Sequence, residues 1–415
     1  MKKVFISLIT ATLLFSACSN DDGQKPDGDE NKTGSLSFNL AFEEAGSGVK
    51  ATALSKAIPI TSWSNIERAQ MFLYEQGTGK VVFSYEIQPS DGNTTFPWSN
   101  IPVGDYDLAL VANMKNSTKN NITTYVAGGA TSEAITDFNV RGRILNSQIF
   151  MDLKKITFPT GHVFETGDEA YAPASEVFTA YAEDVHIVEG TPANLGTLKL
   201  KRDVSLMRVR INKKADFLNE TGKKVNFADA SNFIVVHRLP VGFGIKTPHT
   251  SPVFLGGILN QNSNENRVMI GATGTTTFNT ANPGADKYKN PEIIDADFTL
   301  WQDIIVLPNV LTTASMDISA DAQDSRKYYV VISALAPAGY KLDDGTEITT
   351  PTPLYWSGTI KGGFTPNVIR EVNLTIRSRG SIINPPGPEE EGDLIITVEP
   401  PQDWNDNIQR TDQEV

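Results

Sequence analysis

The stretch Ser35-Leu36-Ser37-Phe38-Asn39-Leu40-Ala41-Phe42 alternates large apolar residues with small or polar ones. Side chains of a β-strand point to opposite faces in turn, so this period of two predicts a half-buried strand. Its buried side would carry Leu36, Phe38, Leu40 and Phe42.

Comparable stretches lie at residues 69–75, 80–87, 106–112, 198–211, 233–239, 328–335 and 368–377. No long run of apolar residues has helical spacing, while glycine (32 residues) and proline (23 residues) are frequent in the connections. These features predict an all-β protein built from antiparallel β-sandwiches.

The composition limits the class of protein. The chain has 415 residues, enough for two sandwiches, and a formal net charge of −13. Such an acidic surface argues against nucleic acid as a partner. The single cysteine excludes an internal disulfide framework and a thiolate zinc cluster.

The amino terminus predicts export. Met1-Lys2-Lys3 precedes an apolar run at residues 4–15, and small residues precede Cys18, so residues 1–17 are predicted to be a signal peptide. Leu14-Phe15-Ser16-Ala17-Cys18 resembles the bacterial lipobox, which implies that the Cys18 sulfur is the lipid attachment site. The alternative is an ordinary signal peptide that ends beside a free cysteine. Residues 18–34 are rich in acids and glycine and predict a tether on the lipid anchor.

The body divides in sequence near residues 189–195, where Gly190-Thr191-Pro192-Ala193-Asn194 predicts a connection. We therefore expect an N-terminal sandwich at residues 35–192 and a C-terminal sandwich at residues 193–380. The turn Pro102-Val103-Gly104-Asp105-Tyr106 leads into a strand, and this pattern recurs in transthyretin-like sandwiches.

Residues 381–415 form a separate tail. The Pro/Glu-rich segment at residues 384–392 cannot join a sheet, but the alternation of Leu394, Ile396 and Val398 predicts one more strand after it. Two interpretations remain open: the strand leaves its own domain, or it folds back as a terminal edge strand.

Taken together, the lipobox, acidic tether, first strand, two sandwiches and tail strand resemble the Bacteroidetes fimbrillins, the subunits of type V pili. The resemblance implies a surface lipoprotein precursor that a trypsin-like protease cuts in the loop after the first strand. Loss of that strand opens a groove, which the C-terminal strand of a neighbouring subunit fills.

For this chain, the resemblance makes Leu36, Phe38, Leu40 and Phe42 the removable strand and Leu394, Ile396 and Val398 the donor strand. The loop at residues 43–58 holds two basic residues, Lys50 and Lys56, which are the candidate processing sites. Well-known members are cut after arginine, which this loop lacks.

The resemblance implies a fimbrial structural subunit that contributes to cell adhesion. Its partners would be other pilus subunits, a processing protease and, through the lipid anchor, the outer membrane; its final location would be the cell-surface fimbrium. The alternatives are an adhesive tip subunit of the same pilus, or a monomeric lipid-anchored surface protein that binds glycans through exposed members of its five tryptophans.

Catalysis is not expected. The chain has no GxSxG elbow, phosphate-binding GxxxxGK[ST] loop or HExxH motif, and we predict no catalytic, cofactor-binding or metal-binding residues. His162, Glu165 and Asp168 could hold a metal, but a polar loop is the simpler interpretation. A basic cluster at residues 199–214 predicts a solvated strand face or a docking surface for acidic groups.

Overall fold

The computed structural model describes part of the chain, and all structural statements below concern that part. The described residues are 32–43, 63, 66, 68–90, 93–113, 122–128, 131–157, 169–212, 223, 225, 234–237, 242–245, 267–270, 298–307, 328–360, 364, 366–376, 378–383, 394–398 and 402–403.

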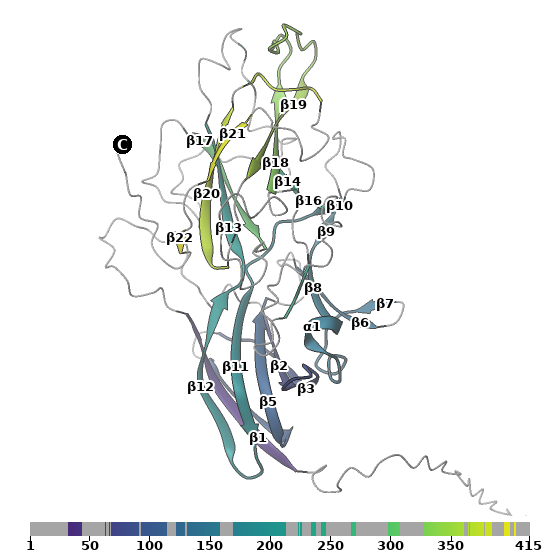
Figure 1. The fold of residues 1–415 in the computed structure, drawn as a ribbon, viewed down its shortest axis with the longest axis vertical. Coiled ribbons are helices and arrows are strands. Elements are labelled where there is room, and N and C mark those ends of the chain that lie inside the picture. Colours follow the sequence, from purple (N-terminus) through teal and green to yellow (C-terminus); the bar gives the residue numbers. More distant parts are fainter. Residues whose placement is uncertain are drawn as a thin grey trace, which may run out of the picture.

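The regular secondary structure of these residues is almost entirely β (Figure 1). The strands are β1 (Thr33–Phe42), β2 (Ala69–Glu75), β3 (Val81–Ile87), β4 (Thr95–Pro102), β5 (Gly104–Ala112), β6 (Ile122–Gly128), β7 (Thr131–Glu133), β8 (Ile149–Leu153), β9 (Lys155–Ile156), β10 (Glu169–Tyr171), β11 (Phe178–Ile187), β12 (Pro192–Arg202), β13 (Ser205–Asn212), β14 (Ile234–His237), β15 (Gly242–Gly244), β16 (Arg267–Ile270), β17 (Phe298–Val306), β18 (Tyr328–Ala336), β19 (Thr352–Ile360), β20 (Val368–Ile376), β21 (Leu394–Val398) and β22 (Gln402–Asp403). The four-residue helix α1 (Leu145–Gln148) precedes β8. No helix in the described ranges has the length and apolar character needed to cross a membrane.

The lower part of the molecule in Figure 1 is a seven-stranded sheet with the order β3-β2-β5-β11-β12-β1-β4. The sheet curls around an apolar core, because its two edge strands meet: the rings of Tyr85 in β3 and Trp98 in β4 are 6.1 Å apart. Strand β4 contains Pro97 and ends at Pro102, and its edge position fits residues that lack a backbone donor.

The upper part contains a six-stranded sheet, β19-β18-β14-β16-β10-β9, and a five-stranded sheet in which β17, β13, β20 and β21 follow one another and β22 also pairs with β20. A second core lies between them, with fully buried Trp356 among its members. A smaller sheet, β15-β8-β6-β7, and α1 contribute to a third core that covers the outer face of the first sheet.

A buried ion pair lies where the chain passes between the two parts. Arg202, the last residue of β12, is 2% exposed, and its guanidinium is 3.5 Å from the Glu176 carboxylate. It also donates a hydrogen bond to Asn367 (3.2 Å) and stacks over the Phe178 ring at 5.1 Å. Asn367 in turn donates its backbone N–H to the carbonyl of Val204, so side chains and backbone from both parts join here.

The all-β prediction is confirmed, and most expected strands are present within a few residues of their expected ends. The predicted strand at residues 198–211 is wrong as a single element. It consists of β12 and β13, which belong to different sheets, with Asp203 and Val204 between them. Strand β12 therefore continues the first sheet beyond residue 192, where we placed the division. The alternation of apolar residues continues from β12 into β13, so the sequence pattern does not indicate that the chain changes sheets between them.

Candidate functional site

Strand β1 occupies an internal position in the first sheet. It pairs in parallel with β12, from Ser35 opposite Pro192 to Phe42 opposite Leu200. On its other side it pairs antiparallel with β4, from Thr33 opposite Pro102 to Asn39 opposite Thr95. The strand thus closes a gap between two strands that have no other contact in the sheet order.

The side chains of β1 fill the first core as the alternation predicts. Leu36, Phe38 and Leu40 are 1%, 1% and 4% exposed. The Phe38 ring lies 6.0 Å from that of Phe96 and 5.0 Å from that of Trp98, both in β4. Burial of each such side chain is worth about 1.5–3 kcal/mol, so β1 is a major contributor to this core.

The end of β1 packs against a residue far along the chain. The Phe42 ring is 4.4 Å from the indole of Trp63 and 5.6 Å from the ring of Phe178 in β11. The next residue, Glu43, still donates its backbone N–H to the carbonyl of Leu200. The whole length of β1 is therefore held, and its connection to Trp63 contains both candidate processing lysines.

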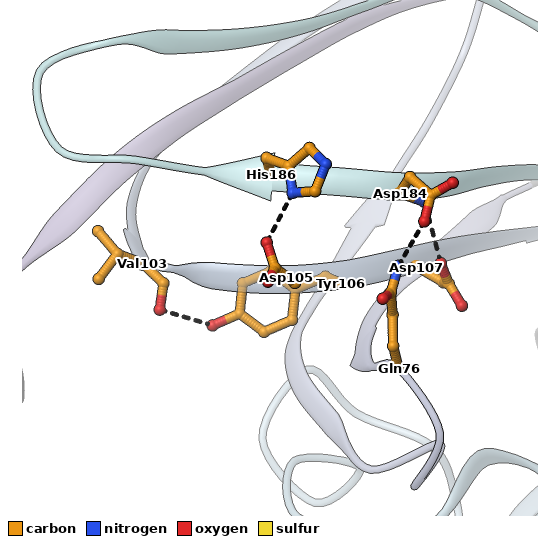
Figure 2. Close-up of polar contacts among 7 residues, drawn as sticks. All are labelled: Gln76, Val103, Asp105, Tyr106, Asp107, Asp184 and His186. Atoms are coloured by element: carbon orange, nitrogen blue, oxygen red, sulfur yellow. Dashed lines mark hydrogen bonds and ion pairs between the residues drawn. The ribbon is translucent and has the colours of Figure 1, made fainter.

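The turn before β5 supports the other end of β1. The backbone N–H of Val103 donates to the Lys32 carbonyl at 3.2 Å. The Tyr106 ring folds back over Gly104, where a Cβ would lie 2.8 Å from the Tyr106 oxygen, and its hydroxyl donates to the carbonyls of Pro102 (3.1 Å) and Val103 (3.3 Å; Figure 2). The predicted Pro-x-Gly-x-Tyr turn is therefore present. The contact between the Tyr106 ring and Gly104 explains why the turn has a glycine at one position and a tyrosine at the other.

Next to this turn lies an exposed ion pair. Nδ1 of His186 in β11 is 2.6 Å from a carboxylate oxygen of Asp105 in β5 (Figure 2). The hydrogen bond to Asp105 and the charge of that carboxylate raise the pKa of His186 above its usual value.

A buried carboxylate, which sequence reasoning missed, fixes the neighbouring bulge. Asp107 is 1% exposed, and its Oδ1 accepts hydrogen bonds from the backbone N–H of Asp184 and from the Gln76 amide, both at 3.1 Å (Figure 2). Asp184 has a φ of 55° in the irregular stretch of β11 between Ala182 and Val185. One sequence feature could have revealed it: Asp107 stands inside the apolar run of β5, and a carboxylate buried at such a position needs hydrogen-bond partners.

The tail strands lie along the edge of the upper part. In β21, Leu394, Ile396 and Val398 stand opposite Ile376, Leu374 and Val372 of β20, respectively. These three β20 residues face the second core, and β22 continues the pairing, with Asp403 opposite Val368. Of the two interpretations of the tail, the structure shows the folded-back edge strand.

The predicted removable and donor strands therefore lie in different sheets: β1 between two neighbours, β21 at an edge. Cys18, Lys50, Lys56, His162 and Trp404 lie outside the described residues. The basic cluster does not form one face, because Lys199 and Lys201 are exposed whereas Arg202 and Arg208 are buried beside Glu176 and Glu371, respectively.

The tryptophans form no exposed row where their side chains are described: Trp356 is buried, and Trp63 and Trp98 are half-buried. Within the described ranges, no group of three His, Cys, Asp or Glu residues is arranged to hold a metal ion.

Comparison with known proteins gives one sequence-family match. The profile described as fimbrillin-A associated anchor proteins Mfa1 and Mfa2 matches residues 37–231, from β1 to beyond β13. No curated protein sequence matches the chain.

Several solved structures are similar along most of the chain. A candidate cell adhesion protein from Bacteroides eggerthii is 14% identical, with a TM-score of 0.45, over 90% of this chain and 97% of its own. A fimbrilin (fimA) from Porphyromonas gingivalis is 14% identical, with a TM-score of 0.40, over 88% and 96%. The tip fimbrial protein Mfa3 from the same species is 10% identical, with a TM-score of 0.35, over 88% and 99%. The sequence match over residues 37–231 supports the predicted resemblance to the fimbrillins.

Proposed function

We propose that this protein is a structural subunit of an adhesive cell-surface fimbrium, exported as an outer-membrane lipoprotein precursor with the lipid on Cys18. A protease removes β1 by cutting after Lys50 or Lys56. The tail strand of a neighbouring subunit, with Leu394, Ile396 and Val398 facing the core, then takes the place of β1.

The observation that carries this proposal is the position of β1. Removal of an edge strand would break hydrogen bonds with only one neighbouring strand. Strand β1 instead lies between β12 and β4 and buries its apolar side in the core. Its removal would leave two unpaired backbone edges and an apolar groove, and both are costly in water. A replacement strand restores the hydrogen bonds and the core together.

Burial of apolar side chains would favour strand replacement. Three or four large side chains at about 1.5–3 kcal/mol each, with ladder hydrogen bonds, give an upper limit on the order of ten kcal/mol before ordering costs. The contact joins the groove of one subunit to the tail of another, which is a head-to-tail arrangement that propagates as a filament.

The tail matches this role in pattern. Leu394, Ile396 and Val398 repeat the period of β1, and they stand opposite Ile376, Leu374 and Val372, which belong to the second core. A strand of this kind favours a polymerising stalk subunit over an anchor, with an adhesive tip subunit as the alternative within the same pilus.

The role requires no cofactor and no catalytic group. The monomeric glycan-binding alternative needs an exposed aromatic platform, and the described tryptophan side chains, which are buried or half-buried, do not favour it.

Limited proteolysis tests the proposal. We expect trypsin to cut the refolded chain early at Lys50 or Lys56, and the cut chains to form oligomers whose size rises with protein concentration. The Lys50→Gln/Lys56→Gln double variant should resist that cut and stay monomeric. Chains that stay monomeric after the cut, or oligomers that survive deletion of residues 393–415, would contradict the proposal.

A further inference from the structure

The segment that precedes the tail is fixed at several points. The indole N–H of Trp356 donates to the carbonyl of Ser378 at 2.9 Å, and the hydroxyl of Tyr340 donates to the carbonyl of Arg379 at 3.0 Å. The backbone N–H of Arg379 donates to a carboxylate oxygen of Asp343 at 2.8 Å, and the Arg379 guanidinium lies 3.5 Å from the same carboxylate.

Beyond Arg379, the backbone pairs with β19. Ser381 donates to the carbonyl of Tyr355 at 3.1 Å and accepts from its N–H at 2.9 Å. Between these contacts, Gly380 has a φ of +90°, and a Cβ there would lie 2.7 Å from Cζ2 of Trp356. Only glycine fits this close approach to a fully buried indole.

We call residues 378–381 with Tyr340, Asp343, Tyr355 and Trp356 the clasp. Its side chains lie partly in the second core: Trp356 is 0% exposed and Tyr340 2%. Burial and the nearby Asp343 carboxylate raise the pKa of Tyr340 to about 12, so its hydroxyl keeps its proton and donates at neutral pH.

The burial ends abruptly after the clasp. Ile382 and Ile383 are 51% and 69% exposed. The next described residue is Leu394, where β21 begins on the edge of β20. The tail is therefore held by edge pairing, whereas the segment before it is held by buried side chains.

We propose that the clasp is an anchored hinge: when the tail separates from β20, the separation stops at Ser381, and the free arm begins at Ile382. The clasp protects β20, whose Val372, Leu374 and Ile376 belong to the second core and would otherwise be pulled away with the tail. Use of the arm for strand exchange depends on the proposed function, but the hinge itself does not.

The position of the hinge also sets the reach of the arm. Twelve residues, 382–393, separate the clasp from Leu394. At about 3.3–3.6 Å per extended residue, the donor strand can begin at most about 47 Å from Ser381. Neighbouring subunits must place their grooves within that distance.

Hydrogen exchange on the intact, unprocessed chain tests the hinge. We compare the amides of β21 with two clasp amides, those of Tyr355 and Ser381, in the natural protein and in three variants. Ile396→Asp puts a charge into β21, Asp343→Ala removes the clasp carboxylate, and Asp344→Ala is the matched control. The Asp344 carboxylate accepts from Thr346 within its own turn.

In the natural protein, we expect the clasp amides to exchange at least tenfold more slowly than those of β21. Ile396→Asp should raise the exchange rates of the β21 amides about tenfold. The rates of the two clasp amides should stay within twofold of those in the natural protein. Asp343→Ala should accelerate the clasp amides about tenfold, and Asp344→Ala should leave them unchanged. Two outcomes would contradict the proposed hinge. The first is that the clasp amides exchange at the same rate as the β21 amides, in the natural protein or in Ile396→Asp. The second is that Asp343→Ala leaves the exchange rates of the clasp amides unchanged. The experiment uses the unprocessed chain, so failure of polymerisation would not affect the result.

Discussion

The rings of Phe42 and Trp63 lie 4.4 Å apart, although Lys50 and Lys56 stand between them in the sequence. A cut at either lysine would leave Trp63 with the body of the protein and Phe42 with the strand that departs. The indole of Trp63 is therefore a natural reporter of the presence of β1.

Phe42→Ala should lower the free energy of unfolding by about 2–3 kcal/mol, because it removes contacts with Trp63 and Phe178 from a half-buried position. Urea unfolding monitored by tryptophan fluorescence measures the change, and the native emission should shift to longer wavelength. Phe138→Ala is the control, since Phe138 is 78% exposed and its loss should cost under about 0.5 kcal/mol. Equal effects of the two variants would show that β1 does not hold Trp63.

Phe38→Ala should cost more, about 3–5 kcal/mol, because its ring is 1% exposed and packs on Phe96 and Trp98. The comparison is Asn39→Ala on the opposite face of β1, whose side chain accepts a hydrogen bond from the exposed Thr95 hydroxyl. Thermal unfolding of both variants would distinguish a core strand from a surface strand. A small effect of Phe38→Ala would contradict the burial of β1 as the basis of the groove.

Arg202→Met should destabilise the precursor by about 3–5 kcal/mol, because it leaves the Glu176 carboxylate buried without its cation. Glu176→Gln in the same chain should recover a substantial part of that loss. A double-mutant cycle from denaturant unfolding measures the coupling. Strict additivity of the two changes would mean that this ion pair contributes no coupling energy to the stability of the precursor.

The pKa of His186 should lie above 6.5, because its imidazolium is stabilised by the hydrogen bond to Asp105. A raised pKa means that the pair adds stability below the pKa of the unfolded chain, and that this stability disappears as the pH rises through the folded pKa. The pair is exposed, so the effect on stability is small. NMR titration of the ring should show a lower pKa in Asp105→Asn, and an unchanged value would exclude Asp105 as the cause.

The sequence predicted features that depend on local pattern. Alternation placed Leu36, Phe38 and Leu40 in a core, and the alternation of Leu394, Ile396 and Val398 predicted the strand β21. It could not predict that β1 pairs in parallel with β12, because nothing local specifies a partner some 150 residues away. The clasp was missed for the same reason: Trp356, Asp343 and Gly380 are ordinary residues until the fold brings them together.

Disulfide trapping in the processed fibre tests strand exchange most directly. With Cys18→Ser, the chain has no cysteine, so an introduced pair is unambiguous. Thr397→Cys is combined in turn with cysteine at Thr197, Lys199 or Lys201, which are exposed on β12 along the edge that β1 now covers. A disulfide requires Cα atoms within about 7 Å, so it reports direct adjacency.

After proteolysis, at least one of these pairs should form disulfides between different subunits. Thr397→Cys with Glu86→Cys should not, because Glu86 lies on β3, which pairs with β2 and not with β1, and no pair should link before the cut. Oligomers that form without a link from Thr397 to β12, or that link equally well to Glu86, would contradict replacement of β1 by a neighbour's tail.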